Sequence, residues 1–204
     1  CTFVDERGII INGDLIIGII SSFWKEKGRL EKNTVVGTIM SNNALENYLN
    51  KIGISFIRTS VGDKNIIEKM QEKNFSLGGE PSGHIILSDY SSTGDGLLAS
   101  LEILRIMKEK NKKLSVISNL FVPNHQVLES YIIDNNKIYK NILLRSENKL
   151  NELKKRIKNN CKLIIRKSGT ENKIRIMAES KSITSAKKVV AASIKIIKEN
   201  DKEK

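Results

Sequence analysis

Apolar positions between residues 34 and 110 follow two alternating spacings. Runs typical of buried strands cover 34–40 and 54–59, and a stretch with helical spacing follows each, at 42–51 and 63–73. Because strand–helix–strand units join parallel strands, this order predicts a mainly parallel sheet. Two shorter strands, at 75–77 and 84–87, and a helix over 94–110 complete the expected α/β/α domain.

The flanking segments carry different patterns. Before the α/β region, apolar runs at 1–4 and 8–11 predict a hairpin, and 15–27 has helical spacing. Beyond Pro123, strands are expected at 127–133, 161–166 and 174–179, a turn at 134–136, and helices at 147–158 and 183–198. Ser182 is a candidate N-cap, and the tail after Lys198 is expected to fray. The fold class predicted is therefore a mixed, mainly parallel α/β/α domain followed by a smaller α+β domain.

Composition narrows the classes of function. The net charge of +12 and pI near 9.6 favour a polyanionic partner, but aromatic residues are only 5% and no stretch alternates them with Arg, so nucleic-acid binding is disfavoured. No apolar run reaches the length of a membrane span. The two cysteines, Cys1 and Cys161, have no metal-ligand spacing, which favours a reducing, cytoplasmic location without a disulfide scaffold.

A glycine-rich loop at 78–84 lies between two predicted strands. It presents a carboxylate (Glu80), a hydroxyl (Ser82) and an imidazole (His84) within five residues. A carboxylate beside a hydroxyl suits recognition of neighbouring sugar hydroxyls. The alternative is a tight turn with an incidental acid, which is the commoner meaning of such a loop alone.

A second loop, at 166–172, combines Arg166, Ser168, Gly169 and Thr170, with Arg175 shortly after it. Arginine offers phosphate a planar fork of donors, hydroxyls add further donors, and the glycine suits a backbone anion nest. The loop predicts phosphate binding, against the alternative of an exposed polar connection. The Walker spacing is absent, so nucleotide hydrolysis is not implied.

Two further polar turns precede predicted helices. The stretch 58–64 leads from a strand into a helix at the sheet edge where ligands bind, although Asp63 could equally be only a helix cap. The turn at 91–96 is interpreted mainly as capping of the long helix, and His125 as structural.

Taken together, these loops resemble the α-D-phosphohexomutase superfamily, most closely its members that act on glucosamine phosphates. The stretches that carry the resemblance are Gly79-Glu80-Pro81-Ser82-Gly83-His84, Thr93-Gly94-Asp95-Gly96, Arg166-Lys167-Ser168-Gly169-Thr170-Glu171 and Ile174-Arg175-Ile176-Met177. Supporting matches are Val4-Asp5-Glu6, Asn12-Gly13-Asp14, 36–42 and Val61-Gly62-Asp63-Lys64. The resemblance covers nearly the whole chain.

The resemblance implies the tail of domain 2 at 1–30, domain 3 at 31–118 and domain 4 at 119–204. It implies that Glu80 and Ser82 bind sugar hydroxyls, with His84 supporting that loop. It also implies that Arg166, Ser168, Gly169 and Thr170 hold the non-reacting phosphate, with Arg175 behind them, and that Asp63 and Lys64 line the cleft. The substrate is expected to be a phosphosugar, interconverted between its 6- and 1-phosphates through a phosphoserine and a bisphosphate intermediate.

The resemblance also shows what to expect elsewhere. The family's phosphoserine loop and Asp-rich magnesium loop have no counterpart in this sequence, so we expect Mg²⁺ ligands outside this chain, no activity from it alone, and the N-terminal domains as a possible separate partner. Lys167 and Asn172 stand where the family usually has proline. The alternatives are a phosphomannomutase or phosphoglucomutase piece, or a non-catalytic phosphosugar- or nucleic-acid-binding protein.

Overall fold

The computed structural model describes residues 1–133, 139–169 and 171–202 of the chain, and it divides into two compact units. Unit 1 is Cys1–Pro123 and unit 2 is Asn124–Lys204. Each unit has its own hydrophobic core. The turn expected at 134–136 lies outside the described residues.

Unit 1 is built on a four-stranded sheet in the order β4-β3-β5-β6. Its strands are β3 (Thr34–Thr38), β4 (Ser55–Thr59), β5 (Leu77–Gly79) and β6 (Ile85–Leu87). β3 pairs in parallel with β4 and β5, whereas β6 runs antiparallel to β5. The mixed, mainly parallel α/β class expected from the sequence is confirmed.

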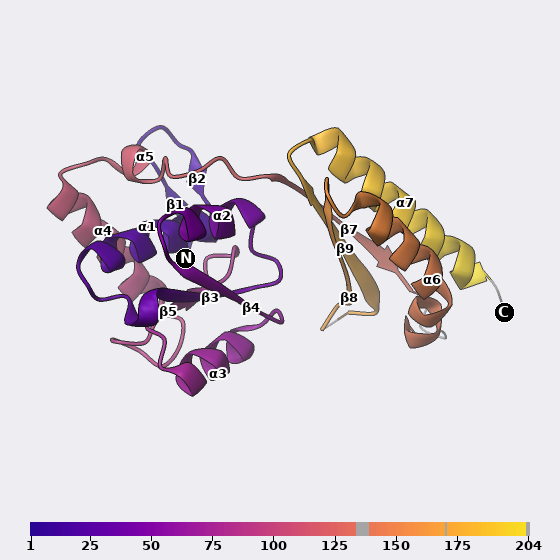
Figure 1. Cartoon of the computed structure of the whole chain (residues 1–204), viewed down its shortest axis with the longest axis horizontal. Helices are drawn as coiled ribbons and strands as arrows, with labels where there is room; N and C mark the ends of the chain where they lie inside the picture. Colours follow the sequence, from indigo (N-terminus) through magenta and orange to yellow (C-terminus); the bar gives the residue numbers. More distant parts are fainter. Residues whose placement is uncertain (134–138, 170, 203–204) are drawn as a thin grey trace. The chain divides into compact units, whose positions relative to one another are not determined.

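Helices cover both faces of this sheet (Figure 1). They are α1 (Gly13–Glu26), α2 (Asn43–Lys51), α3 (Asp63–Lys73), α4 (Gly96–Lys110) and the short α5 (Leu114–Ile117), with a single 3-10 turn at Glu31–Asn33. α3 packs on one face with a small core of its own, and on the other face α1 contacts both α2 and α4. Side chains alternate across the strands, so neighbours such as Val35 and Val36 enter different cores.

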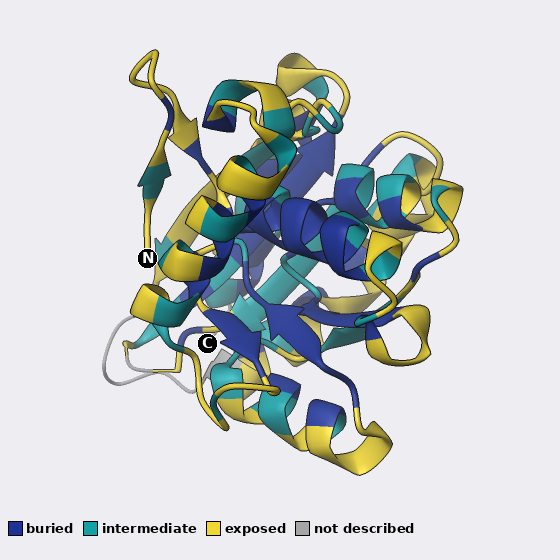
Figure 2. Ribbon diagram, turned by 90° about the vertical axis from the view of Figure 1, so that its left-hand side faces the viewer, coloured by how far each residue is buried: buried dark blue, intermediate teal, exposed yellow. Residues whose placement is uncertain are grey.

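The first helix packs into the core of unit 1. A hairpin and helix at 1–27 left over from another domain would be expected to show an uncovered apolar face. In α1, however, Ile16, Ile17, Ile20 and Trp24 are at most 1% exposed and belong to the larger core of unit 1. The hairpin ahead of it, β1 (Phe3–Val4) with β2 (Ile10–Ile11), forms as predicted. Buried faces of strands and helices are dark blue in Figure 2.

Unit 2 is an antiparallel three-stranded sheet, order β7-β9-β8, with two helices. The strands are β7 (His125–Ile132), β8 (Lys162–Lys167) and β9 (Lys173–Ser180), and the helices are α6 (Tyr139–Ile157) and α7 (Ile183–Lys202). α6 begins eight residues before the predicted start. α7 continues past Lys198 to Lys202, where fraying was expected, because Asp201 accepts a hydrogen bond from the hydroxyl of Tyr131 at 2.7 Å.

Candidate functional site

The Glu80 loop lies directly after β5, at the edge where the parallel strands β3 and β4 also end. Its backbone closes on itself, since the N–H of Glu80 donates to the carbonyl of His84 at 2.9 Å and that of Gly83 donates to the carbonyl of Glu80 at 3.0 Å. Gly83 has φ +92°, a conformation that favours glycine. The start of α1 holds the loop, because Gly13 N–H donates to the carbonyl of Pro81 at 3.0 Å.

The carboxylate of Glu80 is held in place from two sides. Glu80 is 8% exposed, and its Oε1 accepts the backbone N–H of Gly62 at 3.0 Å. Its Oε2 accepts the hydroxyl of Ser82 at 3.4 Å. The acid expected in the first loop is therefore a fixed acceptor at the carboxyl edge of the sheet.

His84 joins this loop to the start of α3. Its Nδ1 lies 3.2 Å from Oδ1 of Asp63 and 3.7 Å from Oε2 of Glu80. Asp63 is the first residue of α3, whose N-cap is Gly62, and no side chain caps this end of the helix. Asp63 therefore does more than begin a helix, because its carboxylate also contacts the ring of His84.

Lys64 takes a different direction from Asp63. Its side chain is 85% exposed, and its Nζ pairs with Oε1 of Glu68 at 3.7 Å on the same helix. The structure therefore brings Asp63, Glu80, Ser82 and His84 together but does not bring Lys64 into this cluster.

Asp63, Glu80 and His84 each offer one potential metal-ligand atom, and these atoms lie within 4.8 Å of one another. Magnesium prefers an octahedron of oxygen atoms, with carboxylates that have room for water. Here one of the three is an imidazole nitrogen, Glu80 already binds Gly62 and Ser82, and Asp63 already faces His84. Among the described residues, this cluster fits a hydrogen-bonded network and does not fit magnesium.

The second loop follows β8 in unit 2. Arg166 and Arg175 are directly opposite each other in the β8–β9 register, so their side chains leave the same face of the sheet. The adjacent pair, Ile165 and Ile176, packs into the core that the helices cover. The two arginines therefore lie on the face away from α6 and α7.

Ser168 is 1% exposed, and its backbone N–H donates to the carbonyl of Lys173 at 2.9 Å. Nε of Arg175 donates to the Ser168 hydroxyl at 3.4 Å, and its Nη2 pairs with Oε2 of Glu171 at 3.1 Å. The ammonium of Lys173, 2.7 Å away, lowers the pKa of Glu171 by a hydrogen bond, and Arg175 adds to this effect. An anion arriving here would compete with the Glu171 carboxylate for Arg175.

One expectation for this loop changes, and another is not tested. Gly169 does not adopt a left-handed conformation, and a Cβ built on it meets nothing within 4 Å, so the backbone at this position does not require glycine. Thr170 lies outside the described residues.

Two residues hold these loops through contacts that were not expected from the sequence. Gly62 fixes Glu80 through its backbone N–H, and the only local signal was a glycine before a helix start. Asn172 accepts the N–H of Ile133 at 3.0 Å through its carbonyl and donates its side-chain N–H to the carbonyl of Ile133 at 3.1 Å. The loop is thereby tied to the end of β7.

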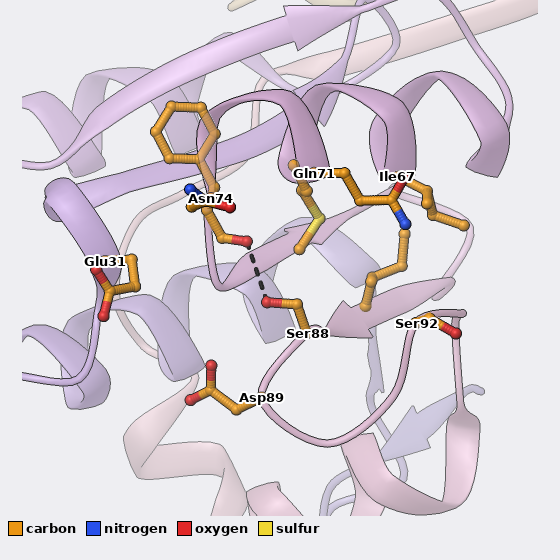
Figure 3. A pocket seen from close by; sticks show the side chains of 10 residues that line it. Glu31, Ile67, Gln71, Asn74, Ser88, Asp89 and Ser92 are labelled. Atoms are coloured by element: carbon orange, nitrogen blue, oxygen red, sulfur yellow. Dashed lines mark hydrogen bonds between the residues drawn. The ribbon is translucent and has the colours of Figure 1, made fainter.

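A pocket of about 380 Å³ opens elsewhere in unit 1, beside α3 (Figure 3). Asn74, after the end of α3, and Ser88, after the end of β6, both line it, so it lies at the sheet edge opposite Glu80. It has no part in the candidate site. Among the described residues, no helix combines the length and apolar character needed to cross a membrane.

Comparison with known proteins places both units in one family. Residues 12–124 match the model for phosphoglucomutase/phosphomannomutase α/β/α domain III, and residues 122–196 match that of the C-terminal domain of the same family. The phosphoglucosamine mutase of Bartonella quintana is 41% identical over 200 residues, which are 97% of this chain and 43% of the relative. The phosphoglucosamine mutase of Parvibaculum lavamentivorans is 42% identical over 193 residues, which are 93% of this chain and 43% of that relative. The chain thus spans less than half the length of these curated relatives.

Solved structures share the fold at low identity. The Aspergillus fumigatus N-acetylphosphoglucosamine mutase in complex with GlcNAc-6P and magnesium matches with a TM-score of 0.76 and 18% identity, covering 98% of this chain and 46% of that one. A variant of the same enzyme in complex with glucose 1,6-bisphosphate matches with a TM-score of 0.78 and 18% identity. This match covers 97% of this chain and 46% of the variant's chain. On the family-model match over most of its length, the chain belongs to the phosphoglucomutase/phosphomannomutase family, the α-D-phosphohexomutases, and carries their third and C-terminal domains.

Proposed function

We propose that the protein to which this chain belongs is a phosphoglucosamine mutase, which interconverts glucosamine 6-phosphate and glucosamine 1-phosphate through a phosphoserine and a bisphosphate intermediate. The observation that carries the proposal is the 41% identity to a phosphoglucosamine mutase along 97% of the chain. This chain would supply the groups that hold the substrate. The phosphoserine would come from the part of the relatives that the chain does not span.

Glu80, Ser82 and His84 are proposed to bind the hydroxyl groups of the sugar ring. Glu80 suits this role because its carboxylate is held by Gly62 before any ligand arrives, so little ordering is needed on binding. A fixed acceptor also penalises an epimer whose hydroxyl points away, since a buried polar group is then left unpaired.

Arg166, Ser168, Gly169 and Thr170 are proposed to hold the phosphate that does not react, with Arg175 behind them and Asp63 and Lys64 lining the cleft. The paired guanidinium positions on one sheet face support this assignment. If the same donors hold either phosphate of the intermediate in turn, the sugar can reorient while the charge of the held phosphate stays neutralised. Positioning and charge neutralisation of this kind promote phosphoryl transfer.

Magnesium is proposed as the cofactor of the intact enzyme because a structural neighbour was crystallised with it. The ligands of the magnesium ion would lie outside this chain. The N-terminal domains would be the partner of this chain, and the enzyme would act in the cytoplasm. When bound, the metal would stabilise negative charge on the phosphoryl group in transit.

Titration of the 204-residue protein with glucosamine 6-phosphate and with inorganic phosphate, followed by calorimetry, tests the proposal. Arg166→Ala should weaken binding of both by about ten- to a hundredfold, and Arg166→Lys should recover only part because it lacks the planar fork. Arg156→Ala, which removes an exposed arginine of α6 near the opposite end of β8, is the charge-matched control.

Glu80→Gln should reduce discrimination among the 6-phosphates of glucosamine, glucose and mannose more than it weakens binding of inorganic phosphate. Preference for the glucose or mannose compound would replace the glucosamine assignment with one of the other mutases. Phosphate affinity unaffected by Arg166→Ala would reject the phosphate site.

A further inference from the structure

The His84 ring is held at one nitrogen. Its side chain is 58% exposed, and Nδ1 contacts Asp63 at 3.2 Å, with Glu80 next nearest at 3.7 Å. Within the described residues, no hydrogen-bond partner is found for Nε2 of this ring. One edge of the imidazole therefore faces fixed carboxylates, and the other edge is available to a ligand.

The backbone fixes the carboxylate that His84 meets first. Asp63 starts α3, and the preceding Gly62 has φ +120° and donates its N–H to Glu80. The same helix start thus positions both carboxylates that face the ring. The charged groups that face Nδ1 are Asp63 from α3 and Glu80 from the loop after β5.

A carboxylate next to Nδ1 determines where the proton of a neutral imidazole resides. Neutral histidine carries one N–H, and an ionised carboxylate only accepts, so the ring must present its N–H at Nδ1 and a lone pair at Nε2. In histidine–carboxylate pairs of this kind, replacing the acid by its amide favours the wrong tautomer.

We propose that Asp63 is a positioning residue that holds His84 in the Nδ1–H form, so that Nε2 accepts a hydrogen bond from a ligand hydroxyl beside the one that Glu80 accepts. The identity of that ligand as a phosphosugar rests on the proposed function. The site then offers two neighbouring acceptors and selects ligands that carry two adjacent hydroxyl donors.

The test is the tautomeric state of His84, read from the ¹⁵N shifts of its ring nitrogens in the labelled protein near pH 9, where histidines are neutral. The chain has two histidines, so His125, which begins β7 in the other unit, is an internal reference. We expect a protonated Nδ1 and an unprotonated Nε2 at His84, and loss of this preference in Asp63→Asn with no change at His125.

Glu68→Gln is the matched control, because it makes the same chemical change on the same helix at a residue that pairs with Lys64. It should leave His84 unchanged. A wild-type His84 protonated at Nε2, or an Asp63→Asn variant with the wild-type tautomer, would overturn the proposal. Should the variant fail to fold, the wild-type spectrum alone still decides.

A second measurement separates this proposal from the proposed function. Asp63→Asn should weaken binding of glucosamine 6-phosphate by about fivefold, the effect of one ordinary hydrogen bond, and leave inorganic phosphate affinity unchanged. Equal weakening of both ligands would contradict the positioning role. If wild-type protein shows no glucosamine 6-phosphate binding, the proposed function fails, while the tautomer of His84 still decides the role of Asp63.

Discussion

Glu102 is a buried acid that stabilises unit 1 away from the candidate site. It is 5% exposed, and it accepts hydrogen bonds from the indole N–H of Trp24 and from Nε and Nη2 of Arg105, the latter two at 2.9 and 2.6 Å. Burial by itself would raise the pKa of Glu102, but the hydrogen bonds from Arg105 and Trp24 and the nearby positive charges lower it.

We expect Glu102→Gln to lower the free energy of unfolding of unit 1 by about 2 kcal/mol at pH 7, the value of charged hydrogen bonds. Because the folded pKa is depressed, the stabilisation is present above the pKa of a free glutamate, roughly 4.3, and is lost as pH falls through the folded pKa. Urea unfolding can be followed by the fluorescence of Trp24, the chain's only tryptophan. The free energies of unfolding of wild type and variant should converge as the pH falls below the folded pKa of Glu102.

Glu109→Gln is the control for this measurement, since Glu109 also pairs with Arg105 but lies at the surface. It should change the free energy of unfolding by less than about 0.5 kcal/mol. A gap between wild type and Glu102→Gln that stays constant from pH 7 to pH 3.5 would show that the effect is one of packing and not of charge.

Two glycines in the candidate loops should respond differently to substitution. Gly83 has φ +92°, whereas Gly169 has an ordinary backbone conformation and open space around it. Gly83→Ala should therefore cost about 1 to 2 kcal/mol for the left-handed backbone, and more where its Cβ would displace the Cys1 backbone carbonyl. Gly169→Ala should leave stability within about 0.5 kcal/mol. Thermal unfolding of the two variants makes the comparison, and equal losses would contradict the loop geometry described here.

Among the elements, α1 is anchored through its apolar face. Its apolar residues lie in the core of unit 1, against α2, α4 and β5. Its backbone amides should exchange with deuterium as slowly as those of β3, because both open only when the unit unfolds. Mass spectrometry of exchange detects this directly, and exchange of α1 well ahead of β3 would mean that the helix is separately mobile.

The β8–β9 loop is tied to β7 by Asn172. Removing its side-chain hydrogen bond in Asn172→Ala should cost about 1 kcal/mol and should accelerate amide exchange at Ile133 and Ser168, the backbone positions next to the tie. Lys158→Ala, an exposed change after α6, serves as the reference. Unaltered exchange at Ile133 would place the constraint elsewhere in the loop.

At the scale of the whole molecule, the chain consists of two units with separate cores. Unit 2 closes its antiparallel sheet with α6 and α7, and the pairing of Tyr131 with Asp201 joins β7 to the last turn of α7. With about 80 residues and its own core, it is large enough to fold alone. Burial, reinforced by Asp201, raises the pKa of Tyr131 to about 12.

We expect residues 124–204 expressed alone to unfold cooperatively with the circular dichroism of a helix–sheet domain. Because the folded pKa of Tyr131 exceeds the ordinary value of about 10, its contribution to stability is complete below pH 10 and is lost as pH rises towards 12. Tyr131→Phe should remove this alkaline loss. A non-cooperative, unstructured product would show that unit 2 depends on unit 1.

The alternation of strands and helices, the mixed and mainly parallel class, and the two loops that carry acids, hydroxyls and arginines could all be predicted from the amino-acid pattern. These follow from local spacing, glycine positions and side-chain chemistry, which need no knowledge of distant contacts. The start of α3 at Asp63 and the presence of a capping turn within 91–96 ahead of α4 were readable for the same reason, although the cap is Asp95 and the helix begins at Gly96, two residues later than expected.

Which of these groups lie in contact could not be predicted in this way, because it depends on long-range packing. The contact of Asp63 with His84 joins residues 21 apart, and the hold of Gly62 on Glu80 joins residues 18 apart. The burial of α1 depends on α4, whose residues follow it by about 80 positions. Such contacts arise because the sheet brings the ends of its strands to one edge. The local spacing of apolar residues does not predict the order and pairing of the strands on which this depends.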